Sequence, residues 1–109
     1  VGDVGSIVMR DRQHLAEDGI MIIVLTLDKG SNTLLSGPDI VSRGFVYVRE
    51  SEDLMEDAKE VVENALDSCL ERNITDWGKI KNTVKDALSD FLWKRTKRSP
   101  MILPIIMEA

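Results

Sequence analysis

The sequence predicts an α+β two-layer sandwich: a three-stranded sheet with two helices on one face, in the order β-β-α-α-β, preceded by an N-terminal arm. Three observations predict it. An apolar run rich in branched residues fills 20–27, two segments with apolar residues at three- and four-residue spacing occupy most of 51–98, and an apolar segment with a central proline covers 101–107. Two amphipathic helices need a common apolar surface, which a small sheet provides.

The first two strands are predicted to form a β-hairpin. The run at 20–27 is apolar at nearly every position, which is typical of a strand covered on both faces, so we expect it at the centre of the sheet. Residues 28–32 are turn formers, and a second strand begins near Thr33. Gly37-Pro38 interrupts that strand and predicts a bulge or bend. We expect the strand to resume and to continue to Val48.

Two amphipathic helices follow. Ser51 is a favoured N-cap, and the two acidic residues after it suit the helix dipole. This helix is expected to stop near Asn73, Thr75 is expected to cap the second helix, and Ser99-Pro100 ends it. The apolar stripe of the first helix is Leu54, Met55, Ala58, Val61, Val62, Ala65, Leu66, Cys69 and Leu70. The stripe of the second is Trp77, Ile80, Val84, Ala87, Leu88, Phe91 and Leu92.

The last strand is expected at Met101 to Met107. Pro104 cannot donate a ladder hydrogen bond, so this strand should lie on a sheet edge. Because the first strand is apolar on both sides, the second face of the sheet needs cover, either from the N-terminal arm or from another chain. Residues 1–18 have too few apolar residues for a core and are expected to be the arm, with a helical turn or two at 11–16, whereas 19–109 are the folded domain.

Composition points to an accessory domain. The 109 residues are 43% hydrophobic, and the net charge of -5 disfavours a dedicated nucleic-acid-binding module, which needs clustered Lys and Arg. The run at 20–27 is too short to span a bilayer. His14 and Cys69, the only residues of their kinds, do not make a zinc site. We interpret His14 as a surface residue and Cys69 as a core residue, so we expect no metal and no catalytic residue. One cysteine fits the reducing cytoplasm.

Three separated segments resemble a known family. They run from Gly2 to Arg12 and on through Leu15 to Ile20, from Ser42 to Tyr47, and from Thr96 to Pro104. In this order, and over nearly the whole chain, they look like the C-terminal region of bacterial ribonuclease J, of the metallo-β-lactamase/β-CASP ribonuclease family.

The resemblance implies a parent enzyme that cleaves RNA with zinc-activated water, as a 5′-to-3′ exonuclease and an endonuclease, in RNA maturation and decay. It implies two zinc ions in the parent's catalytic domain and none in this chain, because the family's histidine- and aspartate-rich metal motifs have no counterpart here. Residues 1–18 would then be a linker from the catalytic region. The domain itself would be non-catalytic, would pack on the catalytic domains, and would help the enzyme to form dimers or tetramers. No catalytic residue is carried over.

Three residues are candidates for a protein interface. Arg43 and Gly44 break the run of the second strand: the glycine permits a close backbone approach or marks a bulge, and the arginine is able to pair with a partner's carboxylate. A plain bulge with a solvated arginine is the alternative. Trp93 lies one position off the second helical stripe, so half exposure at an interface is expected.

The alternative function is an accessory RNA-binding module. Its candidate phosphate contacts are the basic cluster Lys94, Arg95, Lys97 and Arg98. The same cluster also suits the negative end of the helix dipole, which is a purely structural role. The strand-helix-helix-strand order resembles KH-like folds, but residues 72–75, between the helices, are not the glycine-rich clamping loop of those folds. An assembly domain is the hypothesis that we prefer.

Overall fold

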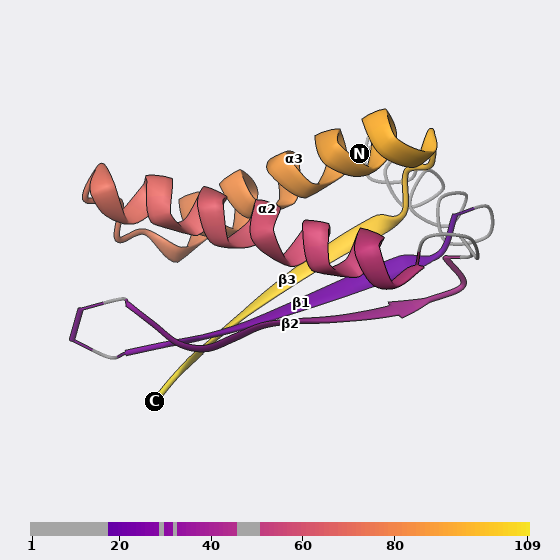
Figure 1. The fold of residues 1–109 in the computed structure, drawn as a ribbon. Coiled ribbons are helices and arrows are strands. Elements are labelled where there is room, and N and C mark those ends of the chain that lie inside the picture. The colour runs from indigo at the N-terminus through magenta and orange to yellow at the C-terminus, as the bar shows by residue number, and fades with distance from the viewer. Residues whose placement is uncertain (1–17, 29, 32, 46–50) are drawn as a thin grey trace, which may run out of the picture.

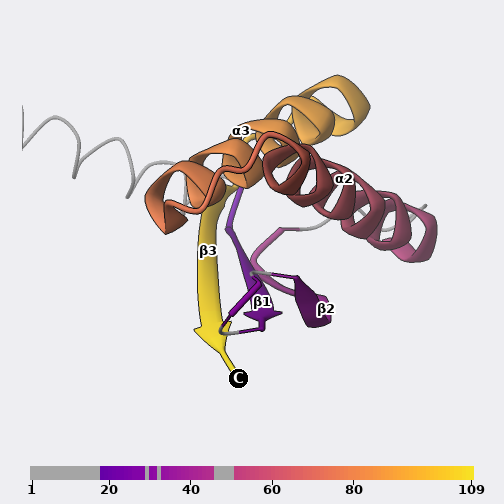
Figure 2. The same ribbon diagram turned by 90° about the vertical axis from the view of Figure 1, so that its left-hand side faces the viewer.

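The computed structural model describes residues 18–28, 30–31, 33–45 and 51–109. Two layers make up the fold, a three-stranded sheet below and two helices above (Figures 1 and 2). The elements are β1 (Ile20–Leu27), β2 (Leu34–Arg43), α2 (Ser51–Glu71), α3 (Trp77–Thr96) and β3 (Met101–Glu108). The predicted fold class and the predicted element order are confirmed. The expectations for residues 1–17, including the turns at 11–16 and His14, lie outside the described residues.

The predicted central position of the first strand is also confirmed. The sheet order is β2-β1-β3, with β1 antiparallel to β2 and parallel to β3. Along β1, alternate side chains are fully buried beneath the helices, and the core lies between the two layers. The buried residues are Met21, Ile23, Leu25, Leu27, Leu54, Ala58, Val62, Ala65, Leu66, Cys69, Ile80, Val84, Leu88, Leu92, Ile102 and Ile106.

The hairpin turn is stabilised by its own side chains. The N–H of Asp28 donates to the carbonyl of Thr33 at 2.8 Å, and the Asp28 carboxylate accepts from the hydroxyl and the N–H of Ser31 at 2.8 and 3.2 Å. The hydrogen bonds that the carboxylate accepts, the one from the Ser31 hydroxyl foremost, hold the pKa of Asp28 below its usual value.

The second strand is shorter than predicted. The expected irregularity at Gly37-Pro38 is present: the peptide bond between them is cis, and the register with β1 shifts between Val24 and Thr26. However, β2 ends at Arg43 and does not run on to Val48. Gly44 has φ 72°, a left-handed conformation that leaves the extended path, and Phe45 packs against the core beyond the strand. Residues 46–48 lie outside the described residues.

The helix ends follow the sequence with two corrections, both on α3. This helix ends at Thr96, before the predicted Ser99-Pro100, because Lys97 adopts a left-handed conformation (φ 59°) as its C-cap. Asn73 adopts φ 56° just after α2, and the N–H of Ile74 donates to the carbonyl of Cys69, so the predicted stop is confirmed. The N-cap of α3 is Asp76, not Thr75: its Oδ1 accepts from the N–H of Gly78 at 2.8 Å. Thr75 and Asp76 are both favoured N-cap residues, and it is Asp76 whose backbone lies at the N-cap position.

The third strand is an edge strand, as Pro104 predicted. The N–H of Met101 donates to Gly19, and the N–H of Ala109 donates to Leu27. Because alternate residues of a strand direct their N–H and C=O groups to opposite sides, the odd-numbered residues of β3 bond to β1 and Pro104 is directed to the free edge. The proline therefore removes a donor where the sheet does not need one.

Candidate functional site

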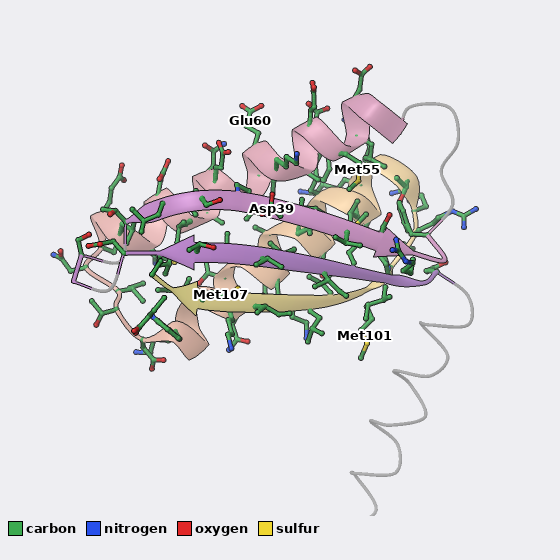
Figure 3. All side chains as sticks on the ribbon, turned by 90° about the horizontal axis from the view of Figure 1, so that it is seen from below. Asp39, Met55, Glu60, Met101 and Met107 are labelled. Carbon is green, nitrogen blue, oxygen red and sulfur yellow. The ribbon has the colours of Figure 1, made fainter. Side chains whose placement is uncertain are left out.

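The face of the sheet that lies opposite the helices exposes apolar side chains of β2 and β3, and we call it the open face (Figure 3). Side chains paired across neighbouring strands point to the same side, so the register determines its members. They are Ile20, Ile22, Val24 and Thr26 from β1, Ser36, Asp39, Val41 and Arg43 from β2, and Met101, Leu103, Ile105 and Met107 from β3. Within the described ranges, no helix or strand packs against this face.

The apolar side chains of the open face are in contact with solvent. The exposed fractions are 40% for Val41, 46% for Leu103, 38% for Ile105 and 53% for Met107. Scattered exposed hydrophobic residues are ordinary, whereas a contiguous apolar patch is a candidate interaction surface. The sequence predicted this surface from the two-sided apolar character of the first strand.

Charge is confined to one edge of the open face. Asp39 and Arg43 both lie on β2 and are exposed, with Val41 between them on the same side of the strand. Nη1 of Arg43 donates to the carbonyl of Ser42 at 2.9 Å, and this is one of the five N–H groups that a guanidinium can donate. The sequence singled out Arg43 but not Asp39. The spacing Asp39, Val41, Arg43 was the signal that could have found the pair, because alternate residues share a face.

The other two candidate interface residues have different surroundings. A Cβ on Gly44 would come within 3.3 Å of the Cα of Gly19, so its close neighbour is a residue of the same chain. Trp93 is 50% exposed, as expected, but it lies on α3 in the helical layer, where Nζ of Lys97 sits 5.4 Å from the centre of its ring. The structure thus brings Arg43 and Gly44 together at one end of β2 and keeps Trp93 apart from the open face.

The basic cluster is largely engaged within the chain. Lys94 pairs with Asp90 at 3.0 Å, and Nη1 of Arg95 donates to Asp57 of α2 at 2.9 Å and lies over the ring of Phe91. For Arg98, the structure describes a bond from its N–H to the Thr96 hydroxyl. Ion pairs at the surface contribute at most about 1 kcal/mol. Both pairs also lower the net positive charge that the cluster offers to a phosphate.

The RNA-binding alternative stays a prediction, and the affinity of the chain for RNA can be measured directly. We expect RNA to bind this cluster weakly, because two of its four cations already have carboxylate partners. Filter binding of a single-stranded RNA at low and moderate salt tests this expectation. A steep loss of affinity with salt that disappears in Lys94→Gln/Lys97→Gln/Arg98→Gln would contradict it, because that behaviour is the signature of phosphate contacts.

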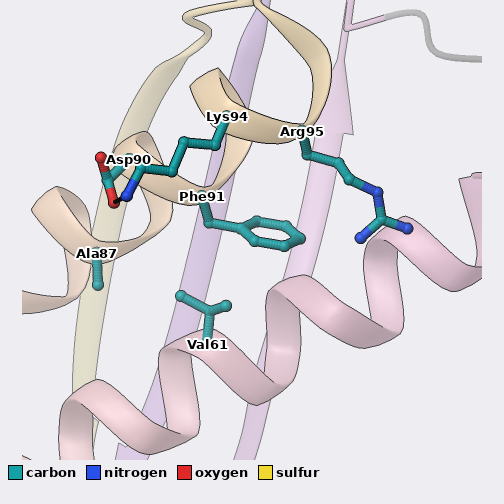
Figure 4. A pocket seen from close by; sticks show the side chains of 6 residues that line it. All are labelled: Val61, Ala87, Asp90, Phe91, Lys94 and Arg95. Carbon is teal, nitrogen blue, oxygen red and sulfur yellow. Dashed lines mark ion pairs between the residues drawn. The ribbon is translucent and has the colours of Figure 1, made fainter.

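The helical layer carries a shallow hollow of about 460 Å³ between α2 and α3 (Figure 4). Val61, Ala87 and Phe91 form its apolar floor, and the ion pair of Lys94 with Asp90 lies on its rim. A second hollow, of about 590 Å³, lies between α3 and the start of β3, with Lys81 and Lys85 among its lining residues.

Metal-ligating residue types are dispersed in the described part of the chain. Residues 18–28, 30–31, 33–45 and 51–109 bring no three His, Cys, Asp or Glu side chains into a group that could hold a metal ion. Cys69 is fully buried in the core, where a thiol behaves as a small hydrophobe. Neither described helix combines the length and the apolar content that crossing a membrane requires.

Comparison with known proteins gives one consistent result. The family model described as "Ribonuclease J C-terminal domain" matches residues 7–109. Ribonuclease J2 of Bacillus subtilis strain 168 is 53% identical over 108 residues, and Ribonuclease J 2 of Staphylococcus aureus strain NCTC 8325 is 51% identical over 108 residues. Both alignments cover 99% of this chain but only 20% and 19% of those relatives, so the chain spans about a fifth of their length. The chain therefore belongs to the ribonuclease J C-terminal domain family.

Proposed function

We propose that this domain is a non-catalytic assembly module of a cytoplasmic ribonuclease J-like enzyme. It mediates self-association into dimers or tetramers and packs on the enzyme's catalytic domains. The observation that carries the proposal is the open face: a small sheet buries one side under its helices and leaves an apolar side in solvent. Burying such a surface is favourable by about 25 cal/mol per Å², so a partner surface is the natural cover.

The size of the open face limits how tightly it associates on its own. Three strands about 4.8 Å apart, with eight residues rising about 3.3 Å each, give a planar footprint of roughly 14 by 26 Å. This is roughly half of the 800 Å² or so that each partner contributes to a stable interface. We therefore expect weak self-association of this chain alone, and tighter association when the rest of the enzyme adds contacts.

Cleavage of RNA belongs, in this proposal, to the remaining four fifths of the parent's length. The relatives carry ribonuclease names, whereas the described part of this chain holds no set of metal ligands. The zinc ions expected from the family resemblance would accordingly lie in the catalytic domain. The contribution of this domain is to hold that catalytic domain in an assembly, and it takes no step in the hydrolysis.

Sedimentation equilibrium tests the proposal. The chain is measured from low to high micromolar concentration, alone and with the separately purified catalytic domains. We expect its average mass to rise toward that of a dimer as the concentration increases, and a complex to form with the catalytic domains. A constant monomer mass at every concentration, together with no binding to the catalytic domains, would overturn it.

A further inference from the structure

We propose that the open face is covered by the open face of a second copy, in one orientation that two charged residues select. The two sheets stack face to face about a twofold axis that runs across the strands near Val41 and Leu103. In this arrangement Asp39 of each copy pairs with Arg43 of the other. The inference rests on the proposed function, and it names the partner and the geometry of that same surface.

The register makes the open face a regular grid. Partner residues on the three strands form rows, and successive rows are two residues apart along each strand, or about 6.6 Å. Three rows matter for the pairing, and each is written here from β2 through β1 to β3. The middle row is Val41, Ile22 and Leu103. The row on one side of it is Arg43, Ile20 and Met101, and the row on the other side is Asp39, Val24 and Ile105. The acid and the base thus occupy the same column, one row on either side of the middle row.

Two open faces can stack about a twofold axis that runs along the strands or about one that runs across them. The two choices place different residues opposite Asp39 and Arg43. An axis along the strands would superpose β2 on β3, so that Arg43 would face Met101 and Asp39 would face Ile105. That arrangement buries each charge against apolar side chains, which is costly without a partner. An axis across the strands through the middle row superposes β2 on β2, so that Asp39 faces Arg43 twice. A face of this kind is self-complementary, as an isologous interface requires.

The position of the charges on β2 fits a role in orientation. β2 is an edge strand, so the two Asp39 and Arg43 pairs would lie at the rim of the sandwich and stay partly in water. Rim pairs add little affinity, but placing like charges opposite each other is unfavourable, so such pairs fix the register of an interface. The apolar side chains of β1 and β3 supply the affinity of the dimer. Asp39 and Arg43 on β2 determine in which orientation the two sheets stack.

A mixing experiment with two charge-reversed variants tests the arrangement. Asp39→Arg places two bases in the column and Arg43→Asp places two acids there, so each variant alone opposes like charges in its homodimer. When the two variants are mixed, every acid again faces a base. We expect each variant alone to associate about tenfold more weakly than the wild-type chain, and the equimolar mixture to recover wild-type affinity as a heterodimer. Sedimentation with one partner fluorescently labelled measures both results.

Matched controls separate the pairing from net charge. Glu60→Arg on α2 and Lys79→Asp on α3 change the net charge by the same amounts at exposed positions of the helical layer. These variants, alone or mixed, should associate like the wild type. Circular dichroism establishes that all four variants are folded.

The possible outcomes separate this inference from the proposed function. A wild-type chain that stays monomeric and does not bind the catalytic domains would overturn both this inference and the proposed function. A wild-type dimer whose charge variants show no recovery on mixing, or no loss when alone, would overturn the twofold arrangement and leave the assembly role standing. Binding to the catalytic domains that is blocked by Leu103→Asp, without self-association, would show that the enzyme's own domains cover the open face.

Discussion

Replacing Leu103 by aspartate is expected to weaken self-association by about a hundredfold and to leave the fold intact. Leu103 lies in the middle row of the open face and is 46% exposed in the single chain, so the carboxylate remains hydrated there. In the assembly the same carboxylate would be buried in an apolar interface beside its symmetry mate. A desolvation cost of several kcal/mol corresponds to a hundredfold or more in the dissociation constant. Sedimentation equilibrium measures the change, and urea unfolding reports on the fold.

Trp93→Asp is the matched control for this prediction. It also replaces a half-exposed apolar side chain by an acid, but in the helical layer, where the ring contacts Lys97. We expect it to associate like the wild type. If Trp93→Asp dissociated the assembly and Leu103→Asp did not, the interface would lie on the helices.

Gly19→Ala is expected to lower the free energy of unfolding by about 2 to 5 kcal/mol, as the sum of a left-handed backbone penalty and an overpacking penalty. Gly19 has φ 82°, and a Cβ there would come within 2.4 Å of the carbonyl oxygen of Arg43 and 2.5 Å of the nitrogen of Phe45. Both atoms belong to the backbone, which cannot move away as a side-chain end can. The Gly19 carbonyl also accepts from Met101, so any shift would disturb the first bond between β1 and β3.

Gly30→Ala provides the comparison for Gly19→Ala in the same urea titration. A Cβ on Gly30 would meet only the Asp28 carboxylate, at 3.8 Å, so its effect should stay within about 0.5 kcal/mol. Equal midpoints for the two variants would contradict the close packing of the strand ends at Gly19.

The elements that the sequence predicted correctly are those in which one residue pattern has one physical solution. An apolar run such as 20–27 is typical of a central strand, and β1 lies at the centre of the sheet although the helices cover only one of its faces; Pro104 restricts its own strand to an edge. The two helices were predicted because the three- and four-residue spacing of their apolar residues matches the 3.6-residue turn of an α-helix. The end of the second strand was wrong because the apolar residues after Gly44 continue the strand pattern, whereas the left-handed φ of Gly44 turns the chain away.

The site was only partly predictable, because its geometry depends on long-range pairing. The alternation of Asp39, Val41 and Arg43 places these side chains on one face of β2, but which face lies opposite the helices depends on the pairing with β1, which the sequence alone does not reveal. The contact of Arg95 with Asp57 joins residues 38 positions apart on two helices, so only the folded chain reveals that this cation is engaged.

Hydroxyl-radical footprinting of the wild-type chain at low and high micromolar concentration tests most directly whether the open face becomes covered. Met107 and Leu103 report on that face, and Trp93, which is equally exposed on the helical layer, serves as the internal reference. Oxidation of Met107 and Leu103 should fall as the concentration rises, while oxidation of Trp93 stays constant. Unchanged oxidation of Met107 and Leu103 across a range in which the mass increases would contradict assembly through the open face.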